Sequence, residues 1–177
     1  DRVFYAGDLT RQGSNAELQL VDERIVGLAP TSLSNSEAAA LPLTSITAWE
    51  LLFDRLQIEK SQNNKLASVL VIGAAGGVGS ILVQLAKQLT NLTVVGTAAR
   101  EESANWLKDL GVDHVLDHSK NLNQQRLAAD LSEFDYVVSL THTDQHLDSI
   151  MEVIKPQGKL ALIDDPASFD ILKLKRK

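Results

Sequence analysis

One stretch of the chain, residues 68–89, has the pattern of a strand, a tight turn and a helix. It begins with an apolar run from Val69 to Ile72, whose β-branched residues are typical of a strand buried on both faces. Glycine and alanine fill residues 73–77, and apolar side chains then recur at helical spacing as far as Leu89. This order predicts the phosphate-binding half of a βαβ unit, because the unpaired amides and the dipole at the helix N-terminus attract a pyrophosphate.

The glycine spacing of this turn fits two templates. Ala74, Gly76 and Gly79 match G-x-G-x-x-G with alanine in the first place, whereas Gly73, Gly77 and Gly79 match the spacing of short-chain dehydrogenases. The second family needs a Tyr-x-x-x-Lys pair, and leucine stands four residues after both tyrosines of this chain. A Walker A loop is excluded because no Lys-Ser/Thr closes the turn. Dinucleotide binding is therefore the prediction, and small residues let the backbone approach the phosphates closely.

The composition excludes several other classes of function. The 177 residues carry 17 basic and 23 acidic side chains, so the net charge of −6 predicts neither a nucleic-acid partner nor an anionic-membrane surface. With no cysteine, these residues hold no disulfide and no thiolate-bound zinc. No run approaches the ~20 apolar residues of a membrane span and no signal peptide opens the chain, so we expect a cytoplasmic protein. The chain starts at Asp1 and its only methionine is Met151, which predicts a fragment of a longer protein.

The first thirty residues contain short predicted strands and no helix, as expected for the end of a small all-β unit (residues 1–33). The predicted strands are Val3–Tyr5, Glu17–Val21 and Ile25–Leu28. Ser34 and Glu37 then form a capping box that predicts a short helix over 37–41. A second helix is predicted from Pro42 to about Gln57, and a polar loop over 60–65 leads into the central strand.

After the central strand and its helix, predicted strands and helices alternate. The strands are Thr93–Thr97, His114–Leu116, Tyr136–Leu140 and Lys159–Ile163, and the helices are 101–110, 123–131 and 144–154. This alternation predicts an α/β fold with a Rossmann-type doubly wound parallel sheet over residues 34–164. Residues 165–177, which end in K-L-K-R-K, are predicted to be a solvated, truncated linker.

Several stretches together resemble the medium-chain dehydrogenase/reductase superfamily. They are A-L-P-L-T-S-I-T-A-W, V-I-G-A-A-G-G-V-G, D-L-G-V-D-H-V-L-D-H and I-K-P-Q-G-K-L-A-L-I-D-D-P. The likeness covers the whole chain and is greatest to the quinone-oxidoreductase branch, also labelled zinc-type alcohol dehydrogenase-like. It implies that the end of a GroES-like catalytic domain is followed by five of the six strands of a Rossmann domain, with the sixth strand absent.

The resemblance implies NADP(H) as cofactor, and the residues after the second Rossmann strand give a physical reason. An NAD-binding unit places an acid there to hold the ribose 2′-hydroxyl. This strand ends in Thr97-Ala98-Ala99-Arg100, and Arg100 can pair with a 2′-phosphate while Thr97 or the backbone supplies smaller contacts. Two other interpretations remain open: Arg100 is only a solvated residue at a helix start, or Glu101 or Glu102 is the acid of an NAD site.

Other cofactor contacts are implied by position in the family pattern. Thr47 lies where the superfamily turns a helix toward the nicotinamide, Thr141 follows the fourth strand, and Ile163 and Asp164 end the fifth. Each could instead be a helix cap or a satisfied loop residue. The glycine turn completes the predicted set with Ala74, Gly76, Gly77, Val78 and Gly79.

We expect no zinc site, although the family label suggests one. Zinc-dependent relatives carry a four-cysteine lobe after the strand that resembles residues 1–5, and this chain has none. Leu43 and Thr44 cannot replace the third catalytic ligand expected shortly before Thr47. His142 and His146 are four residues apart, but without a third strong ligand they are predicted to be capping and surface residues.

The resemblance implies hydride transfer from NADPH to a small electrophilic molecule, such as a quinone or an α,β-unsaturated carbonyl. Without zinc to polarise a carbonyl, conjugated acceptors are easier to reduce than simple ketones. No residue is predicted to be catalytic. The alternatives are a zinc-dependent alcohol dehydrogenase and a sensor protein that binds NADPH without turnover. Relatives often dimerise, so a homodimer of the full-length protein is possible.

Overall fold

A computed structural model describes residues 1–61, 67–166, 168 and 170–175 of the chain. Residues 1–47 form one compact unit and residues 48–177 form a second. This division does not test the domain limits predicted at residues 33 and 164, which stay predictions. Part of the predicted polar loop over 60–65 and the last two residues of the basic tail lie outside the described residues.

The first unit holds a two-stranded antiparallel sheet and a short capped helix. Its elements are β1 (Val3–Phe4), η1 (Glu23–Ile25), β2 (Gly27–Leu28) and α1 (Asn35–Ala39). The predicted capping box is confirmed, because the Ser34 hydroxyl accepts from the Glu37 amide while the Glu37 carboxylate accepts from the Ser34 amide. The strand predicted over Glu17–Val21 is wrong: its leucines, Leu18 and Leu20, are exposed, and the segment has no strand partner among the described residues.

The helix predicted from Pro42 to about Gln57 is present but changes its hydrogen-bond pattern. It runs as α2 (Pro42–Trp49) and continues as the π-helical segment η2 (Glu50–Arg55). The change in pattern is visible at the end of η2, where the Leu56 amide donates to the Leu51 carbonyl five residues back. Leu51, Leu52 and Leu56 are buried.

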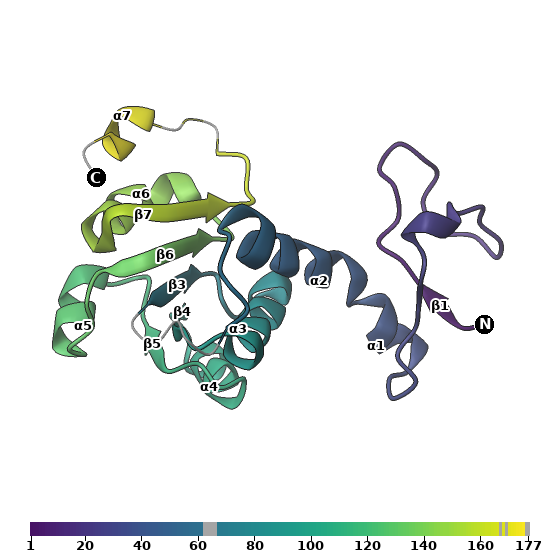
Figure 1. The fold of residues 1–177 in the computed structure, drawn as a ribbon, viewed down its shortest axis with the longest axis horizontal. Helices are drawn as coiled ribbons and strands as arrows, with labels where there is room; N and C mark the ends of the chain where they lie inside the picture. The colour runs from purple at the N-terminus through teal and green to yellow at the C-terminus, as the bar shows by residue number, and fades with distance from the viewer. Residues whose placement is uncertain (62–66, 167, 169, 176–177) are drawn as a thin grey trace. The chain divides into compact units, whose positions relative to one another are not determined.

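The second unit is built on a parallel sheet of five strands, in the order β5-β4-β3-β6-β7 (Figure 1). The strands are β3 (Ser68–Ile72), β4 (Thr93–Thr97), β5 (His114–Leu116), β6 (Phe134–Ser139) and β7 (Ile154–Leu162). The helices are α3 (Gly77–Leu89), α4 (Glu101–Asp109), α5 (Leu122–Ala128), α6 (Thr143–Val153) and α7 (Ile171–Leu174). The predicted Rossmann-type α/β fold with five parallel strands is confirmed, and α7 lies within the segment predicted to be a linker.

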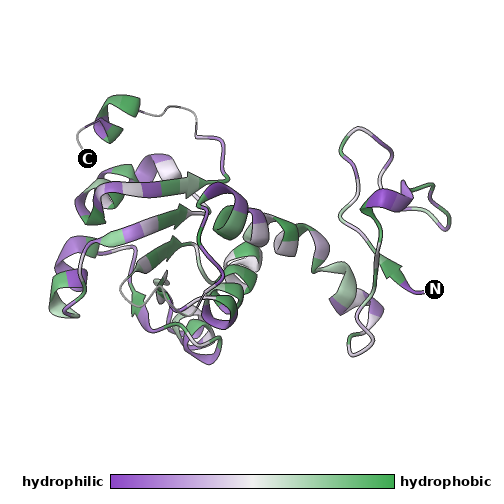
Figure 2. Ribbon diagram, in the orientation of Figure 1, coloured by the Kyte–Doolittle hydropathy of each residue, from purple (hydrophilic) through white to green (hydrophobic). Residues whose placement is uncertain are grey.

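The central strand β3 divides the core into two layers. Val69 and Val71 pack with α3, α4 and η2, whereas Leu70 and Ile72 pack with α5 and α6 on the opposite face. All four side chains are at most 1 % exposed, as the apolar run predicted for a strand covered on both sides. Figure 2 shows the same contrast, since β3 is hydrophobic along its length while the helices around it are mixed.

The last strand is longer than predicted, because it passes through the Pro156-Gln157-Gly158 segment instead of starting after it. Phe134 pairs with Ile154 and Tyr136 pairs with Lys159, so one residue of β6 faces four residues of β7. Gln157 takes up this excess with a φ of 62°. The predicted strand began only at Lys159, and proline and glycine are uncommon in the interior of strands.

Helix α3 lies so close to the turn that follows β3 that only glycine fits at one position. A Cβ built on Gly79 would lie 2.4 Å from the Ala74 carbonyl oxygen and 2.6 Å from its Cα. This is the close helix–strand packing that the last glycine of G-x-G-x-x-G provides in dinucleotide-binding turns.

No helix of the described residues is long and apolar enough to span a membrane.

We predict that Gly79→Ala destabilises the protein by about 2 kcal/mol or more, because the added methyl group would overlap the Ala74 backbone and push α3 from the sheet. Chemical denaturation measures this loss. Gly13→Ala is the matched control, since a Cβ at Gly13 meets nothing within 4 Å. Equal stability of the Gly79 variant and the control would contradict the close packing.

Candidate nucleotide-binding site

The predicted site residues of the second unit gather at one edge of the parallel sheet. Strands β3, β4, β6 and β7 run in the same direction, so the segments that follow them leave the sheet at its carboxyl edge. These segments are 73–76, 98–100, 140–142 and 163–164. In open α/β sheets, ligands bind outside this edge, at the point where the strand order reverses.

The glycine turn is held from two neighbouring strand ends. Gly73 has a φ of +77°, a conformation that favours glycine, and the Gly76 amide donates to its carbonyl at 3.1 Å. The Gly73 amide donates to the hydroxyl of Thr97, at the end of β4, at 3.3 Å. A Cβ on Gly73 would lie 3.1 Å from the Thr141 methyl group, which follows β6. The turn is therefore fixed by Thr97 and Thr141, two residues that the sequence had placed at the ligand edge.

The N-terminus of α3 has the features of an anion-binding site. Its N-cap residue is Gly76, which has no side chain to cap the first turn, and no acidic residue stands in that turn. Ser80 is the first residue of the helix whose amide reaches back to a carbonyl, that of Gly76. The amides of Gly77, Val78 and Gly79 thus lie before the first helical hydrogen bond, at the positive end of the dipole. Together with the close approach at Gly79, these residues fit a dinucleotide pyrophosphate.

Arg100 lies where a 2′-phosphate would be recognised. It is the N-cap residue of α4, three residues beyond the end of β4, and it is exposed. None of the ion pairs or side-chain hydrogen bonds found among the described residues includes its guanidinium group. An arginine that is committed to no carboxylate can form a bidentate pair with a phosphate.

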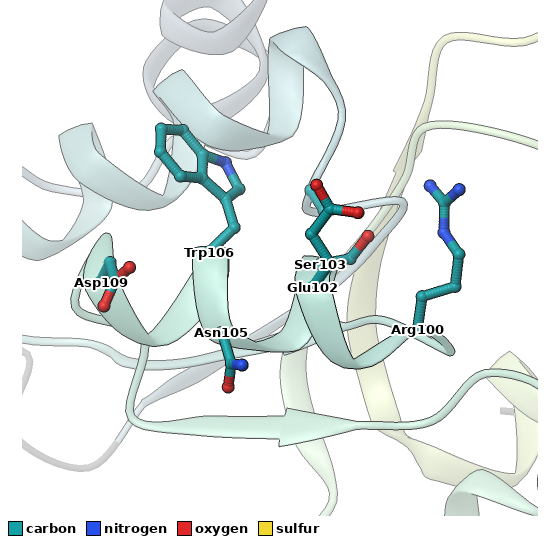
Figure 3. A pocket seen from close by; sticks show the side chains of 7 residues that line it. Arg100, Glu102, Ser103, Asn105, Trp106 and Asp109 are labelled. Atoms are coloured by element: carbon teal, nitrogen blue, oxygen red, sulfur yellow. The ribbon is translucent and has the colours of Figure 1, made fainter.

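A pocket of about 550 Å³ extends from Arg100 along α4. Figure 3 shows Arg100 reaching away from the start of the helix, with Glu102 in its first turn and Trp106 and Asp109 farther along. Trp106 donates its ring N–H to the Ser80 hydroxyl at 2.9 Å, which ties α4 to α3. The pocket is lined by Ala75, Arg100, Glu102, Ser103, Asn105, Trp106 and Asp109.

The acids that would favour NAD instead remain present. Glu101 and Glu102 both lie in the first turn of α4, where the helix dipole stabilises a carboxylate in any case. Glu102 lines the pocket beside Arg100. The geometry thus supplies one cation and one acid at the same place.

Asp164 was predicted to contact the cofactor, but its hydrogen-bond partner in the structure is another residue of the chain. Its carboxylate accepts hydrogen bonds from the Thr143 amide at 2.7 Å and from the Thr143 hydroxyl, so it caps the N-terminus of α6. The Thr143 hydroxyl also lies 2.7 Å from the hydroxyl of Ser139 at the end of β6. Burial raises the pKa of the Asp164 carboxyl, but the hydrogen bonds from Thr143 outweigh it and keep the pKa below the ordinary value of 3.8. The network fixes the ends of β6 and β7 to one helix.

This network of Ser139, Thr143 and Asp164 was missed by sequence reasoning. Ser139 and Thr143 are fully buried, yet their types are common in loops and caps. The available signal was Thr143, the residue just before the helix predicted over 144–154, four residues after Ser139 of the strand predicted over Tyr136–Leu140. The contact of Trp106 with Ser80 gave no comparable signal.

The other residues that were predicted to contact the cofactor make few interactions within the protein. Ile163 is 42 % exposed, and its amide donates to the Ser139 carbonyl at 3.3 Å. The Thr141 hydroxyl lies 2.6 Å from Nδ1 of His142. Thr47 belongs to the first unit, where its hydroxyl donates to the Leu43 carbonyl at 2.9 Å. Their roles toward a cofactor stay predictions.

The described residues do not fit a zinc site. They contain no group of three or more histidine, cysteine or acidic side chains arranged to hold a metal ion, and the whole sequence lacks cysteine. These residues therefore support no reaction step that uses zinc.

Comparison with known proteins agrees with this fold. The model of the zinc-binding dehydrogenase family matches residues 77–174. A zinc-type alcohol dehydrogenase-like protein of Staphylococcus aureus (strain MRSA252) is 43 % identical over 179 residues, which cover 99 % of this chain and 53 % of that protein. The 2-methylene-furan-3-one reductase of Solanum lycopersicum is 43 % identical over 108 residues, which cover 61 % of this chain and 26 % of the reductase.

Solved structures give the same result. A Rhizobium etli CFN 42 protein described as a zinc-dependent alcohol dehydrogenase superposes with a TM-score of 0.92 and 55 % identity, over 98 % of this chain and 51 % of that one. A mycobacterial protein complexed with NADPH superposes with a TM-score of 0.71 and 26 % identity, over 87 % and 47 % of the two chains. The chain thus spans about half the length of the relatives it matches. It belongs to the zinc-binding dehydrogenase family of oxidoreductases, in the quinone-oxidoreductase-like branch of the medium-chain dehydrogenase/reductase superfamily.

Proposed function

We propose that the chain is the nucleotide-binding part of an NADPH-dependent oxidoreductase that reduces a quinone or an α,β-unsaturated carbonyl without zinc. The observation that carries the choice of NADPH is the uncommitted guanidinium group of Arg100 beside the glycine turn. The family's use of nicotinamide cofactors supports the class of reaction, and the NADPH complex of the mycobacterial protein supports the 2′-phosphate.

Each part of the carboxyl edge has a proposed task. The amides at the start of α3 bind the pyrophosphate, and Arg100 binds the 2′-phosphate. The bonded set of Ser139, Thr143 and Asp164 holds the ends of β6 and β7 in place beside the nucleotide. When bound, NADPH supplies the hydride, and the protein orients the cofactor and keeps water from it.

Two observations support a conjugated acceptor. The Solanum lycopersicum relative is named for the reduction of a methylene-furanone, which is an enone. In addition, the described residues contain no metal-ligand group that could polarise an isolated carbonyl. A conjugated acceptor takes hydride at its β-carbon and delocalises the resulting charge onto oxygen, so it depends less on such polarisation.

We predict that the protein binds NADPH at least tenfold more tightly than NADH, and that Arg100→Ala removes about 1.4 kcal/mol or more of this preference. The reason is the loss of the guanidinium–phosphate pair. Isothermal titration with both nucleotides measures the preference. Lys108→Ala is the matched control, because Lys108 lies in the last turn of the same helix, and it should leave the preference unchanged. Equal affinity for the two nucleotides, or tighter NADH binding, would refute the assignment and favour Glu102 as an NAD-binding acid.

We predict that the full-length protein oxidises NADPH with a quinone or an enone at least about tenfold faster than with a saturated ketone, a difference of about 1.4 kcal/mol in the barrier. A metal chelator should leave the rate unchanged. The assay follows NADPH absorbance with each acceptor in turn. Loss of activity on chelation with recovery on added zinc would identify a zinc-dependent alcohol dehydrogenase. Tight NADPH binding without turnover of any acceptor would favour the sensor interpretation.

A further inference from the structure

One buried polar atom of a side chain in the described part of the protein has no hydrogen-bond partner, Nδ1 of His118. His118 lies in the turn that follows β5, at the carboxyl edge of the sheet. The neighbouring Asp117 does not satisfy it, because its carboxylate accepts from the Ser119 amide and hydroxyl and pairs with Lys120. Buried polar atoms without partners are uncommon in proteins and call for an explanation.

The His118 ring instead packs against a second histidine. The ring centroids of His118 and His146 are 5.8 Å apart, and the planes meet at 77°, edge to face. His146 lies in the first turns of α6 and is half-buried, and its pair therefore joins the end of β5 to the start of that helix. We call His118 and His146 the histidine pair.

The charged groups around the histidine pair do not compensate a positive charge on His146. His142, at the N-cap of α6 in a left-handed conformation, lies on the same side, and the positive end of the α6 dipole opposes an imidazolium. Asp144 and Asp164 act in the opposite direction, but Asp164 is already bonded to Thr143.

Lys173 of α7 pairs with Asp148 of α6 itself, and two other cations near the helix are engaged elsewhere. Arg126 of α5 donates to Asn123 and to the Leu131 carbonyl. Lys155 of β7 is paired with Asp135 of β6 at the amino ends of those strands, away from the start of α6.

The surroundings of His146 favour its neutral form. Burial lowers the pKa of His146 below its ordinary value of 6.5, and the neighbouring His118 and His142 lower it further. A group whose pKa is lower in the folded state than in the unfolded state favours folding while it is neutral. For a histidine, this stabilisation is complete above about pH 6.5 and is lost as the pH falls.

We propose that the histidine pair is a pH-sensitive contact that holds the start of α6 in place, and that protonation of His146 releases it. The release would pass to the nucleotide edge through residues already in contact. Thr143, in the same turn as His146, holds Asp164 at the end of β7, and Thr141, just before the helix, lies against Gly73 of the glycine turn. Acid is therefore expected to weaken nucleotide binding, a consequence that rests on the proposed function.

Proton NMR of the histidine rings tests the contact without any nucleotide. The expected midpoint for His146 lies below 6.5, and His118→Gln is expected to move it upward, because a neutral amide replaces the second imidazole. His114→Gln is the matched control, since His114 lies on β5 outside the pair and should leave the midpoint unchanged. A His146 midpoint at or above 6.5, or one that His118→Gln leaves unchanged, would overturn the proposal.

Amide hydrogen exchange at Thr143 and Asp144 tests the release itself. From pH 7.5 to 5.5, after correction for the intrinsic pH dependence of exchange, protection is expected to fall several-fold in the native protein. The double variant His118→Gln/His146→Gln should show no such fall. Equal pH dependence in the native protein and the double variant would overturn the proposal even if both fold normally.

The same pH pair then tests the consequence for binding, with NADP⁺ as the probe because NADPH decomposes in acid. Its affinity is expected to fall more in the native protein than in the double variant, and this comparison cancels the titration of the 2′-phosphate itself. An equal fall in both proteins would show that the histidine pair does not affect nucleotide binding, and would overturn that part of the proposal. If NADP⁺ binds at neither pH, the proposed cofactor fails, while the ring and exchange measurements still decide the pH-sensitive contact.

Discussion

The close approach of α3, at Gly79, to the turn that follows β3 is the constraint on which the nucleotide edge depends. With no side chain between Gly79 and the Ala74 backbone, the helix begins directly over the end of the central strand. Its first amides are then aimed at the carboxyl edge, where Thr97 at the end of β4 accepts from the Gly73 amide and Thr141, after β6, lies close to the same glycine. A larger residue would separate helix and strand, and the amides would no longer converge on one phosphate.

The two helices that follow the neighbouring strands β3 and β6 use their N-termini differently. The first turn of α3 has no capping side chain, whereas the first turn of α6 is occupied by Asp164 of the chain itself. Because the Asp164 carboxylate occupies the N-terminus of α6, this helix is a structural support, and α3 is the one of the two that can bind a ligand phosphate. Asp164 was predicted to touch the cofactor, and this division explains how it can serve the site by holding the start of α6 in position.

Sequence reasoning identified the elements whose signals are local. The strand His114–Leu116 was predicted with its observed limits, and the turn at Gly73 and the helix after it follow directly from the residue pattern. It failed where the outcome depends on a distant partner. The Glu17–Val21 segment has strand-like residues but no neighbour to pair with among the described residues, and β7 crosses a Pro-Gln-Gly segment because β6 accommodates a bulge. The partner of Asp164 likewise depends on Thr143, which lies on another element.

The most direct test of the account is an amide NMR titration of the protein with NADP⁺ at neutral pH. If the start of α3 binds the pyrophosphate, the amide signals of Gly77, Val78 and Gly79 shift most, and that of Thr143, already bonded to Asp164, shifts much less. Saturating NADP⁺ that leaves these three signals in place, in a folded protein, would contradict the central claim that this turn is a nucleotide site.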